Sequence, residues 1–222
     1  MASMATRMNE ISAAEMRAAM VDSQLRTNDV IDPAVVAAMG AEPREAHVPA
    51  ALASVAYMDR AIDLGGGRWL SPPLVTGRLL VAAAVRPGAR VLLIGAATGY
   101  TAALLARLGA AVVALEERSD LIETGRQAGT GAVTWVEGPL ADGAPQAAPF
   151  DRILIEGAIE QLPQAIVDQL ADGGRLVAAR RDGAVSRLVQ GVKAGGTVAL
   201  RPFADMDVPL LPGFAVPTGF RF

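Results

Sequence analysis

The chain has 222 residues, a formal net charge of −3 and 52% apolar residues. This length suffices for one domain with a full core and an extension. There is no cysteine and only one histidine, His47, so disulfides, thiolate metal sites and paired-histidine metal motifs are excluded and no metal is expected. The acidic balance, the lack of ~18 consecutive apolar residues and a start without a leader pattern predict a cytoplasmic protein that binds neither nucleic acid nor membrane.

The first third of the chain predicts helices followed by an irregular segment. Ser12–Leu25 is expected to form an amphipathic helix, with Ser12 as its cap and Glu15 completing a capping box. Asp32-Pro33 predicts the start of a second, short helix that ends at Gly40. Residues 42–70 have no clear periodicity and include three consecutive glycines, so we expect an irregular, functional surface segment. Residues 1–72 are therefore assigned to an N-terminal helical extension.

From residue 73 onward, helical patterns alternate with short apolar runs. Helices are expected over 73–85, 100–108, 120–128 and 162–170, and buried strands over 90–94, 111–115, 133–136 and 152–155. This alternation predicts an α/β fold with a doubly wound, mostly parallel sheet. Runs at 175–179, 186–190 and 197–200 predict strands that close the sheet, partly as an antiparallel hairpin. The core is therefore assigned to 73–201, and the proline-rich residues 202–222 to an irregular tail.

The clearest motif follows the first buried strand. Gly95, Ala96, Ala97, Thr98 and Gly99 form a loop of small residues that leads into a helix. Small residues allow close approach of a ligand, and a helix N-terminus offers unpaired N–H donors. Glu116 ends the next strand about twenty residues on, where a carboxylate can accept both hydroxyls of a ribose. Together they predict a nucleotide-cofactor site; the alternative is a glycine turn that serves packing alone.

The residue types in this loop distinguish between cofactors. A dinucleotide fingerprint needs glycine at its first, third and sixth positions, which here are Gly95, Ala97 and Tyr100. Tyr100 is too bulky for close approach of a pyrophosphate. We therefore interpret the loop as a site for S-adenosylmethionine, and we keep a nicotinamide-dependent oxidoreductase as an alternative.

Several segments match one family in their order along the chain. They are His47-Val48-Pro49, Ala56-Tyr57-Met58-Asp59, residues 65–73, the glycine loop with Glu116, residues 149–153 and residues 162–177. From about Met20 to about Val189 the chain thus resembles the protein-L-isoaspartate O-methyltransferases, whose usual Gly-Gln-Thr-Ile-Ser-x-Pro stands here as residues 67–73. The resemblance implies a Rossmann-like methyltransferase fold. It also implies methyl transfer from S-adenosylmethionine to the side carboxylate of an isoaspartyl residue, which is a protein-repair reaction.

The resemblance also implies roles for individual residues. Ser71 occupies the position of the family's active-site serine and would hold the carboxylate acceptor. The cofactor would contact the Gly95–Gly99 loop, Glu116, Gly138 and Leu140, with Glu156 as a further carboxylate near it. For Ser71 the alternative is a helix cap, and for Glu156 it is a solvated strand end or a partner of a helix N-cap. The implied partner is a protein or peptide with an isoaspartyl residue, and the sequence does not specify an oligomeric state.

Three positions depart from the family's pattern. The family usually has an acidic residue at Leu93, a glycine at Ala97 and an aspartate at Pro139. Proline supplies neither a side-chain acceptor nor a backbone donor. These departures favour an alternative of a different class, a methyltransferase-fold protein that has lost catalysis and serves binding or regulation. Among the remaining polar residues of the extension, we expect Glu42, Arg44 and Glu45 to form a solvated turn and His47 to be a hydrogen-bonded loop residue.

Overall fold

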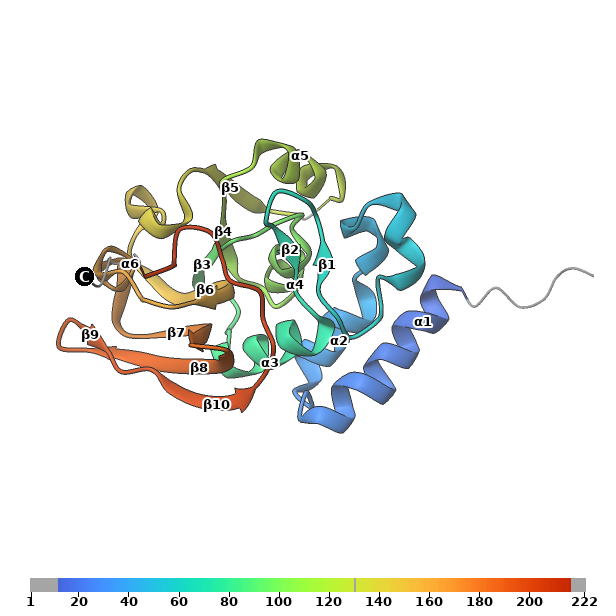
Figure 1. The fold of residues 1–222 in the computed structure, drawn as a ribbon, viewed down its shortest axis with the longest axis horizontal. Coiled ribbons are helices and arrows are strands. Elements are labelled where there is room, and N and C mark those ends of the chain that lie inside the picture. Colours follow the sequence, from blue (N-terminus) through green and yellow to red (C-terminus); the bar gives the residue numbers. More distant parts are fainter. Residues whose placement is uncertain (1–11, 130, 217–222) are drawn as a thin grey trace, which may run out of the picture.

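The computed structural model describes residues 12–129 and 131–216, which fold around one central sheet (Figure 1). The strand order is β10-β8-β7-β6-β3-β4-β5, with β9 pairing beside β8. The bounds are β3 Arg90–Ile94, β4 Ala111–Glu116, β5 Val133–Glu137, β6 Phe150–Ile159, β7 Leu170–Asp182, β8 Val185–Ala194, β9 Thr197–Val198 and β10 Arg201–Asp205. Strands β3 to β7 are parallel, whereas β8 runs antiparallel to β7, β9 and β10. The predicted fold class is confirmed.

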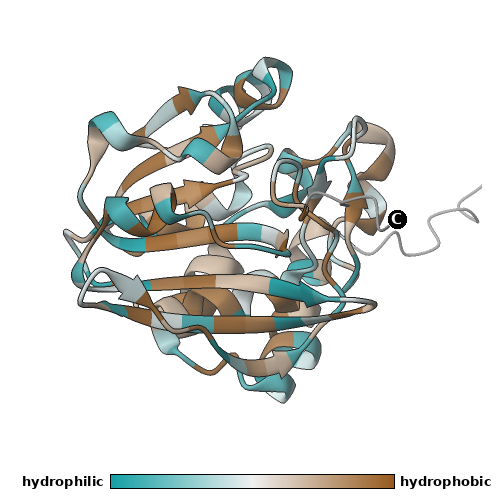
Figure 2. Ribbon diagram, turned by 60° about the vertical axis from the view of Figure 1, so that its left-hand side comes forward, coloured by the Kyte–Doolittle hydropathy of each residue, from teal (hydrophilic) through white to brown (hydrophobic). Residues whose placement is uncertain are grey.

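The helices are α1 Ala13–Ala19, α2 Pro33–Ala41, α3 Pro73–Ala83, α4 Tyr100–Arg107, α5 Ser119–Gln127 and α6 Gln164–Gln169. Helices α3 to α6 pack against strands of the sheet, whose successive residues face opposite sides. In β3, Val91 and Leu93 pack into a core with residues of α3 and α4, whereas Leu92 and Ile94 pack into a second core with α6. Figure 2 shows the result as hydrophobic colour along the central strands. No helix in residues 12–129 or 131–216 is long and apolar enough to cross a membrane.

The N-terminal extension combines predicted helices with a hairpin that was not predicted. Ser12 and Glu15 form the expected capping box, and α1 continues as a π-helical turn to Leu25. Asp32 caps α2 with its side chain. The segment expected to be irregular contains two 3₁₀ turns and the antiparallel hairpin of β1, Ile62–Asp63, and β2, Trp69–Leu70. The glycines between β1 and β2 form its tip.

The C-terminal segment is more ordered than the sequence indicated. The predicted tail boundary after residue 201 falls inside β10, an edge strand in which Pro202 is tolerated. Beyond it, Leu211 and Phe214 are fully buried. The prediction of an irregular surface tail is therefore wrong for these positions, because apolar residues of the tail complete the core. Residues 217–222 lie outside the described residues.

The strand order fixes where a ligand site can lie. The chain passes from β3 to β4 and β5 on one side, and then returns to place β6 on the other side of β3. In parallel α/β sheets, ligands bind outside the carboxyl ends of the strands at such a switch point. Here that position is the Gly95–Gly99 loop after β3.

Candidate functional site

The carboxylate that ends β4 lies against the loop that leaves β3. Glu116 Oε2 accepts a hydrogen bond from the amide of Ala97 at 2.8 Å, and Oε1 accepts one from the amide of Glu117 at 3.0 Å. The neighbouring parallel strands bring these groups together, since Ile94 pairs with Leu115 directly before the loop and Glu116. The structure therefore joins the loop and the carboxylate that the sequence analysis paired.

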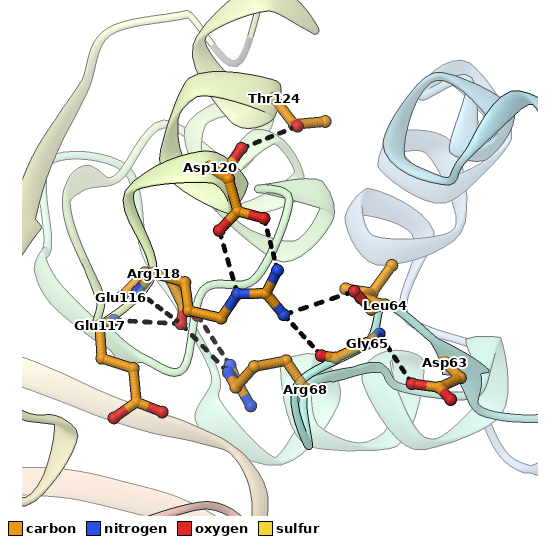
Figure 3. Close-up of polar contacts among 9 residues, drawn as sticks. All are labelled: Asp63, Leu64, Gly65, Arg68, Glu116, Glu117, Arg118, Asp120 and Thr124. Carbon is orange, nitrogen blue, oxygen red and sulfur yellow. Dashed lines mark hydrogen bonds and ion pairs between the residues drawn. The ribbon is translucent and has the colours of Figure 1, made fainter.

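A guanidinium group occupies the remaining side of this carboxylate. Arg68, from the β1–β2 hairpin, donates from Nε to Glu116 Oε1 at 3.1 Å and from Nη2 to Oε2 at 2.7 Å (Figure 3). Arg68 is 2% exposed and Glu116 is 0% exposed, so water reaches neither partner. Two-pronged, charge-assisted pairs of this kind are among the strongest polar contacts in proteins. Both oxygens that a ribose would need are thus already engaged.

A leucine from the C-terminal segment covers the start of the loop. A Cβ atom added to Gly95 would come within 2.9 Å of Leu211 Cδ1 and 3.1 Å of Arg68 Nη2. A Cβ atom added to Gly157 in β6 would likewise come within 2.9 Å of Leu211. The Leu211 amide donates to the carbonyl of Ala158 at 2.8 Å. The C-terminal segment therefore crosses the carboxyl ends of β3 and β6, as the red trace in Figure 1 shows.

The loop is also fastened to the N-terminal extension. All five residues from Gly95 to Gly99 are buried. Thr98 Oγ1 donates to the carbonyl of His47 at 2.6 Å, and the Thr98 carbonyl lies 2.8 Å from His47 Nδ1. Nε2 of the same histidine lies 3.0 Å from Glu42 Oε1. His47 is thus hydrogen-bonded, as predicted, but it ends the 3₁₀ turn Arg44–His47 and does not lie in a loop. Thr98 is used for this connection.

Ala97 adopts a backbone conformation that disfavours side chains. Its φ angle is 49°, in the left-handed region. There the Cβ atom of an L-residue crowds the backbone, at a cost of roughly 1–2 kcal/mol, whereas glycine is unstrained. The positive φ angle therefore explains why the family that the chain resembles usually has glycine at this position. Ala97 keeps the conformation while its amide donates to Glu116.

Two other departures remove polar groups from this edge of the sheet. Leu93 is fully buried in the core that contains α3 and α4. Pro139 is exposed after β5, where an acceptor side chain is absent. Next to it, the Gly138 amide donates to the carbonyl of Glu116 at 3.2 Å, and the Leu140 side chain lies in the core that contains α6. Gly138 therefore contributes to this edge of the sheet through its backbone amide, and Leu140 through the packing of its side chain.

Ser71, which precedes α3, and Glu156, which contacts it, are both buried. Helix α3 begins after Pro72 without a side-chain cap, so Ser71 is not its cap. The Ser71 carbonyl accepts a hydrogen bond from Arg44 Nη2 at 2.5 Å. Glu156 Oε1 accepts one from Thr76 Oγ1 of α3 at 2.8 Å. Glu156 is 6% exposed, which rules out a solvated strand end.

The turn that was expected to be solvated is largely buried. Arg44 is fully buried, donates from Nε to the carbonyl of Ala56 at 2.7 Å and lies over the Tyr100 ring at 4.7 Å. Glu42 is 5% exposed and accepts from Arg107 Nε at 2.6 Å. Burial raises the pKa of Tyr100 to about 12, so its hydroxyl stays protonated at neutral pH. The solvated-turn prediction is wrong for Arg44 and Glu42, because Arg44 donates to backbone carbonyls and Glu42 pairs with Arg107 of α4, and these long-range contacts leave no signal in the sequence pattern.

The site in this closed arrangement does not fit an adenosyl group. Such a group needs the oxygens of Glu116 and clearance above Gly95, which Arg68 and Leu211 now take. A cavity of about 390 Å³ lies instead near the end of β6, lined by residues of β6, α6 and β9, and none of the candidate site residues lines it. Arg68 was not among the residues predicted for the site. The only signal for it was its place in the Gly67–Pro73 segment.

Comparison with known proteins identifies the family. The pattern of the protein-L-isoaspartate(D-aspartate) O-methyltransferase family, abbreviated PCMT, matches residues 14–207. This chain belongs to that family. A protein-L-isoaspartate O-methyltransferase of Methylorubrum populi is 44% identical over 164 residues, covering 72% of this chain and 77% of the relative. Another, from Methanoculleus marisnigri, is 38% identical over 203 residues, covering 89% of this chain and 92% of the relative.

Solved structures of PCMT proteins share the fold. One protein-L-isoaspartate O-methyltransferase superposes with a TM-score of 0.76 at 21% identity, over 89% of this chain and 66% of that chain. A Plasmodium falciparum protein described as a member of the family, in complex with S-adenosyl-L-homocysteine, has a TM-score of 0.74 at 19% identity, over 88% of this chain and 97% of that chain. The sheet described above is therefore the S-adenosylmethionine-dependent methyltransferase fold of the PCMT family.

Proposed function

We propose that the chain is an S-adenosylmethionine-dependent O-methyltransferase that methylates the side carboxylate of L-isoaspartyl residues in proteins or peptides. The observation that carries this proposal is the Glu116 carboxylate at the end of β4, held against the loop after β3 by the Ala97 amide. Membership of the PCMT family over residues 14–207 supports it. The proposed ligand-contacting residues are the Gly95–Gly99 loop, Glu116, Gly138, Leu140 and Glu156. A cytoplasmic location stays a prediction.

The acceptor side of the reaction makes modest demands on the protein. A carboxylate is already ionised at pH 7, so no side chain has to remove a proton from it. What the protein must supply is orientation of the acceptor and exclusion of water. Ser71 is buried and its backbone is fixed by Arg44. We assign its hydroxyl to donate a hydrogen bond to the acceptor carboxylate.

Methyl transfer to matched peptides tests this function. Purified chain is incubated with labelled S-adenosylmethionine at millimolar concentration and with an isoaspartyl peptide or its normal aspartyl twin. We expect label in the isoaspartyl peptide alone. Ser71→Ala should lower kcat about tenfold through lost orientation. Ser186→Ala, which changes a buried serine bonded to the Met206 carbonyl on β8, serves as the matched control. Absence of transfer to either peptide would contradict the proposal.

A second candidate is a family member that has lost catalysis and acts as a binding or regulatory protein. The observation that favours it is the filling of the site by Arg68 and Leu211, together with Leu93 and Pro139 at positions that usually carry acidic residues. Calorimetric titration with S-adenosyl-L-homocysteine separates the two candidates. Binding supports the enzyme, and lack of binding even after Arg68→Gln supports the second candidate.

A further inference from the structure

The hairpin that carries Arg68 is a compact element. Ile62 pairs with Leu70 and Asp63 with Trp69, while the Leu64 amide donates to the carbonyl of Arg68 at 2.9 Å. The tip consists of Gly65, Gly66 and Gly67, which all have positive φ and are exposed. In contrast, the side chain of Arg68 points inward to Glu116 (Figure 3). The hairpin therefore has a solvent-facing tip and a single charged side chain inserted into the site.

A second arginine holds the outer part of the hairpin. Arg118, two residues after Glu116, donates from Nη1 to the carbonyls of Leu64 at 3.4 Å and Gly65 at 2.5 Å. Its Nε donates to Asp120 Oδ1 at 3.0 Å, which orients the guanidinium toward the hairpin (Figure 3). The Arg118 side chain is 29% exposed, so this contact is accessible to solvent. Both arginine contacts thus converge on the turn after β4, one buried and one exposed.

The buried contact competes directly with a ligand at Glu116. Each Glu116 oxygen already accepts one backbone amide and one guanidinium N–H, which fills its two lone pairs and leaves no acceptor for a ribose hydroxyl while Arg68 is in place. A ligand that needs the open site binds with an apparent affinity reduced by the fraction of molecules that are open. The guanidinium is also well placed to keep that fraction small, since it pairs a charge that would otherwise be buried alone.

We propose that residues 62–70 form a lid over the cofactor site, and that Arg68 sets cofactor affinity by occupying the ribose-binding face of Glu116. This inference rests on the proposed function. An adenosyl ligand takes the place of the guanidinium, and the hairpin swings outward as the contacts of Arg118 with Leu64 and Gly65 break. At the tip, a Cβ atom added to Gly65 or Gly67 would meet nothing within 4 Å, and only the Arg118 side chain lies against Gly66, so release of Arg118 leaves the tip free to move.

Calorimetry with S-adenosyl-L-homocysteine tests the lid. Gln keeps much of the length and polarity of Arg68 but lacks the charge and the fork. We expect Arg68→Gln to bind the ligand at least tenfold more tightly than the natural chain, and Arg118→Gln to bind it severalfold more tightly. Arg187→Gln, which removes an exposed ion pair with Asp205 between β8 and β10, should leave affinity unchanged. If Arg68→Gln does not fold, Arg118→Gln retains the buried pair and carries the test.

Hydrogen exchange gives a readout independent of affinity. Ligand should speed amide exchange in residues 62–70 of the natural chain, although binding usually slows exchange near a site. Without ligand, Arg68→Gln should already exchange faster there. Equal, measurable affinity in the natural chain and both variants, or slower exchange in the hairpin on binding, would overturn the lid and leave the proposed function intact. No binding in any of them would overturn both.

Discussion

At the scale of single residues, Arg68 and Glu116 form a buried ion pair within the site. Removing one member of a buried ion pair leaves an uncompensated charge and typically costs about 3–5 kcal/mol. We expect Glu116→Gln to lower the free energy of unfolding by this amount in urea at pH 7. The double variant with Arg68→Gln should recover part of the loss. Asp205→Asn, in an exposed pair with Arg187, should cost less than about 1 kcal/mol. Similar losses of unfolding free energy in Glu116→Gln and Asp205→Asn would show that the buried pair contributes no more than the exposed one.

A second residue-scale prediction concerns Ala97. Because its φ is positive, Ala97→Gly should relieve strain and raise the free energy of unfolding by about 1 kcal/mol. The adjacent Ala96→Gly is the matched control. It removes a buried methyl group at a residue outside the positive-φ set, so it should be destabilising. Urea unfolding of both variants checks the prediction, and a loss of stability in Ala97→Gly would count against strain.

Sequence reasoning at this scale found Glu116 and the loop but not what contacts them. A carboxylate at the end of a buried strand follows from local pattern. Arg68 follows a run of glycines, and charged residues in such segments are usually exposed. Its burial depends on a partner 48 positions away in the sequence, so no local pattern reveals it. The same holds for Arg44, which pairs with carbonyls of distant residues.

At the scale of elements, the extension docks on α4 through a buried carboxylate. Burial acts to raise the pKa of Glu42, but hydrogen bonds from His47 and Arg107 outweigh it and hold the pKa below the ordinary value of 4.5. A lowered pKa means stability that is complete above pH 4.5 and is lost as the pH falls through the folded-state value. We expect Glu42→Gln to be less stable at pH 7 and to show a smaller fall in urea midpoint below pH 4.5. An unchanged pH profile would contradict this, and the exposed Glu137→Gln is the control.

The C-terminal segment gives a second prediction at this scale. Leu211 is 1% exposed and packs on Gly95 and Gly157. Leu211→Ala should cost about 2–5 kcal/mol of unfolding free energy, since it deletes buried methyl groups. It should also strengthen binding of S-adenosyl-L-homocysteine, because it clears space above Gly95. The half-buried neighbour Leu210→Ala should lose less stability and gain no affinity. Calorimetry and urea unfolding on the same samples check both halves.

Elements with strong local signals were predicted closely, whereas those that depend on pairing were not. The first buried strand, Arg90–Ile94, has the predicted bounds, because an apolar run between two turns marks both ends of a strand in the sequence. Helix α4 begins at Tyr100 as predicted. The β1–β2 hairpin was missed because each strand has two residues, too few to show alternation. Strand β10 was missed because Pro202 argues against a strand unless that strand lies at an edge.

At the scale of the whole molecule, the order of motifs identified the family, while the closed state of the site depends on long-range contacts. The loop after β3 meets the extension through His47 and the C-terminal segment through Leu211. These segments lie on opposite sides of it in the sequence, so both the N-terminal extension and the segment after β10 contact the site. Sequence patterns describe each segment separately and therefore could not predict that together they close it.

The covalent attachment of Arg68 to the protein has a practical consequence. A guanidinium tethered by a short hairpin is present at the same local concentration however far the sample is diluted. Dialysis, which strips a diffusible competitor, leaves this one in place. Assays run at a very low concentration of S-adenosylmethionine would therefore register little turnover, even from a chain whose catalytic residues are intact. The full rate of the enzyme should be measured by raising the concentration of S-adenosylmethionine, since further purification does not remove Arg68.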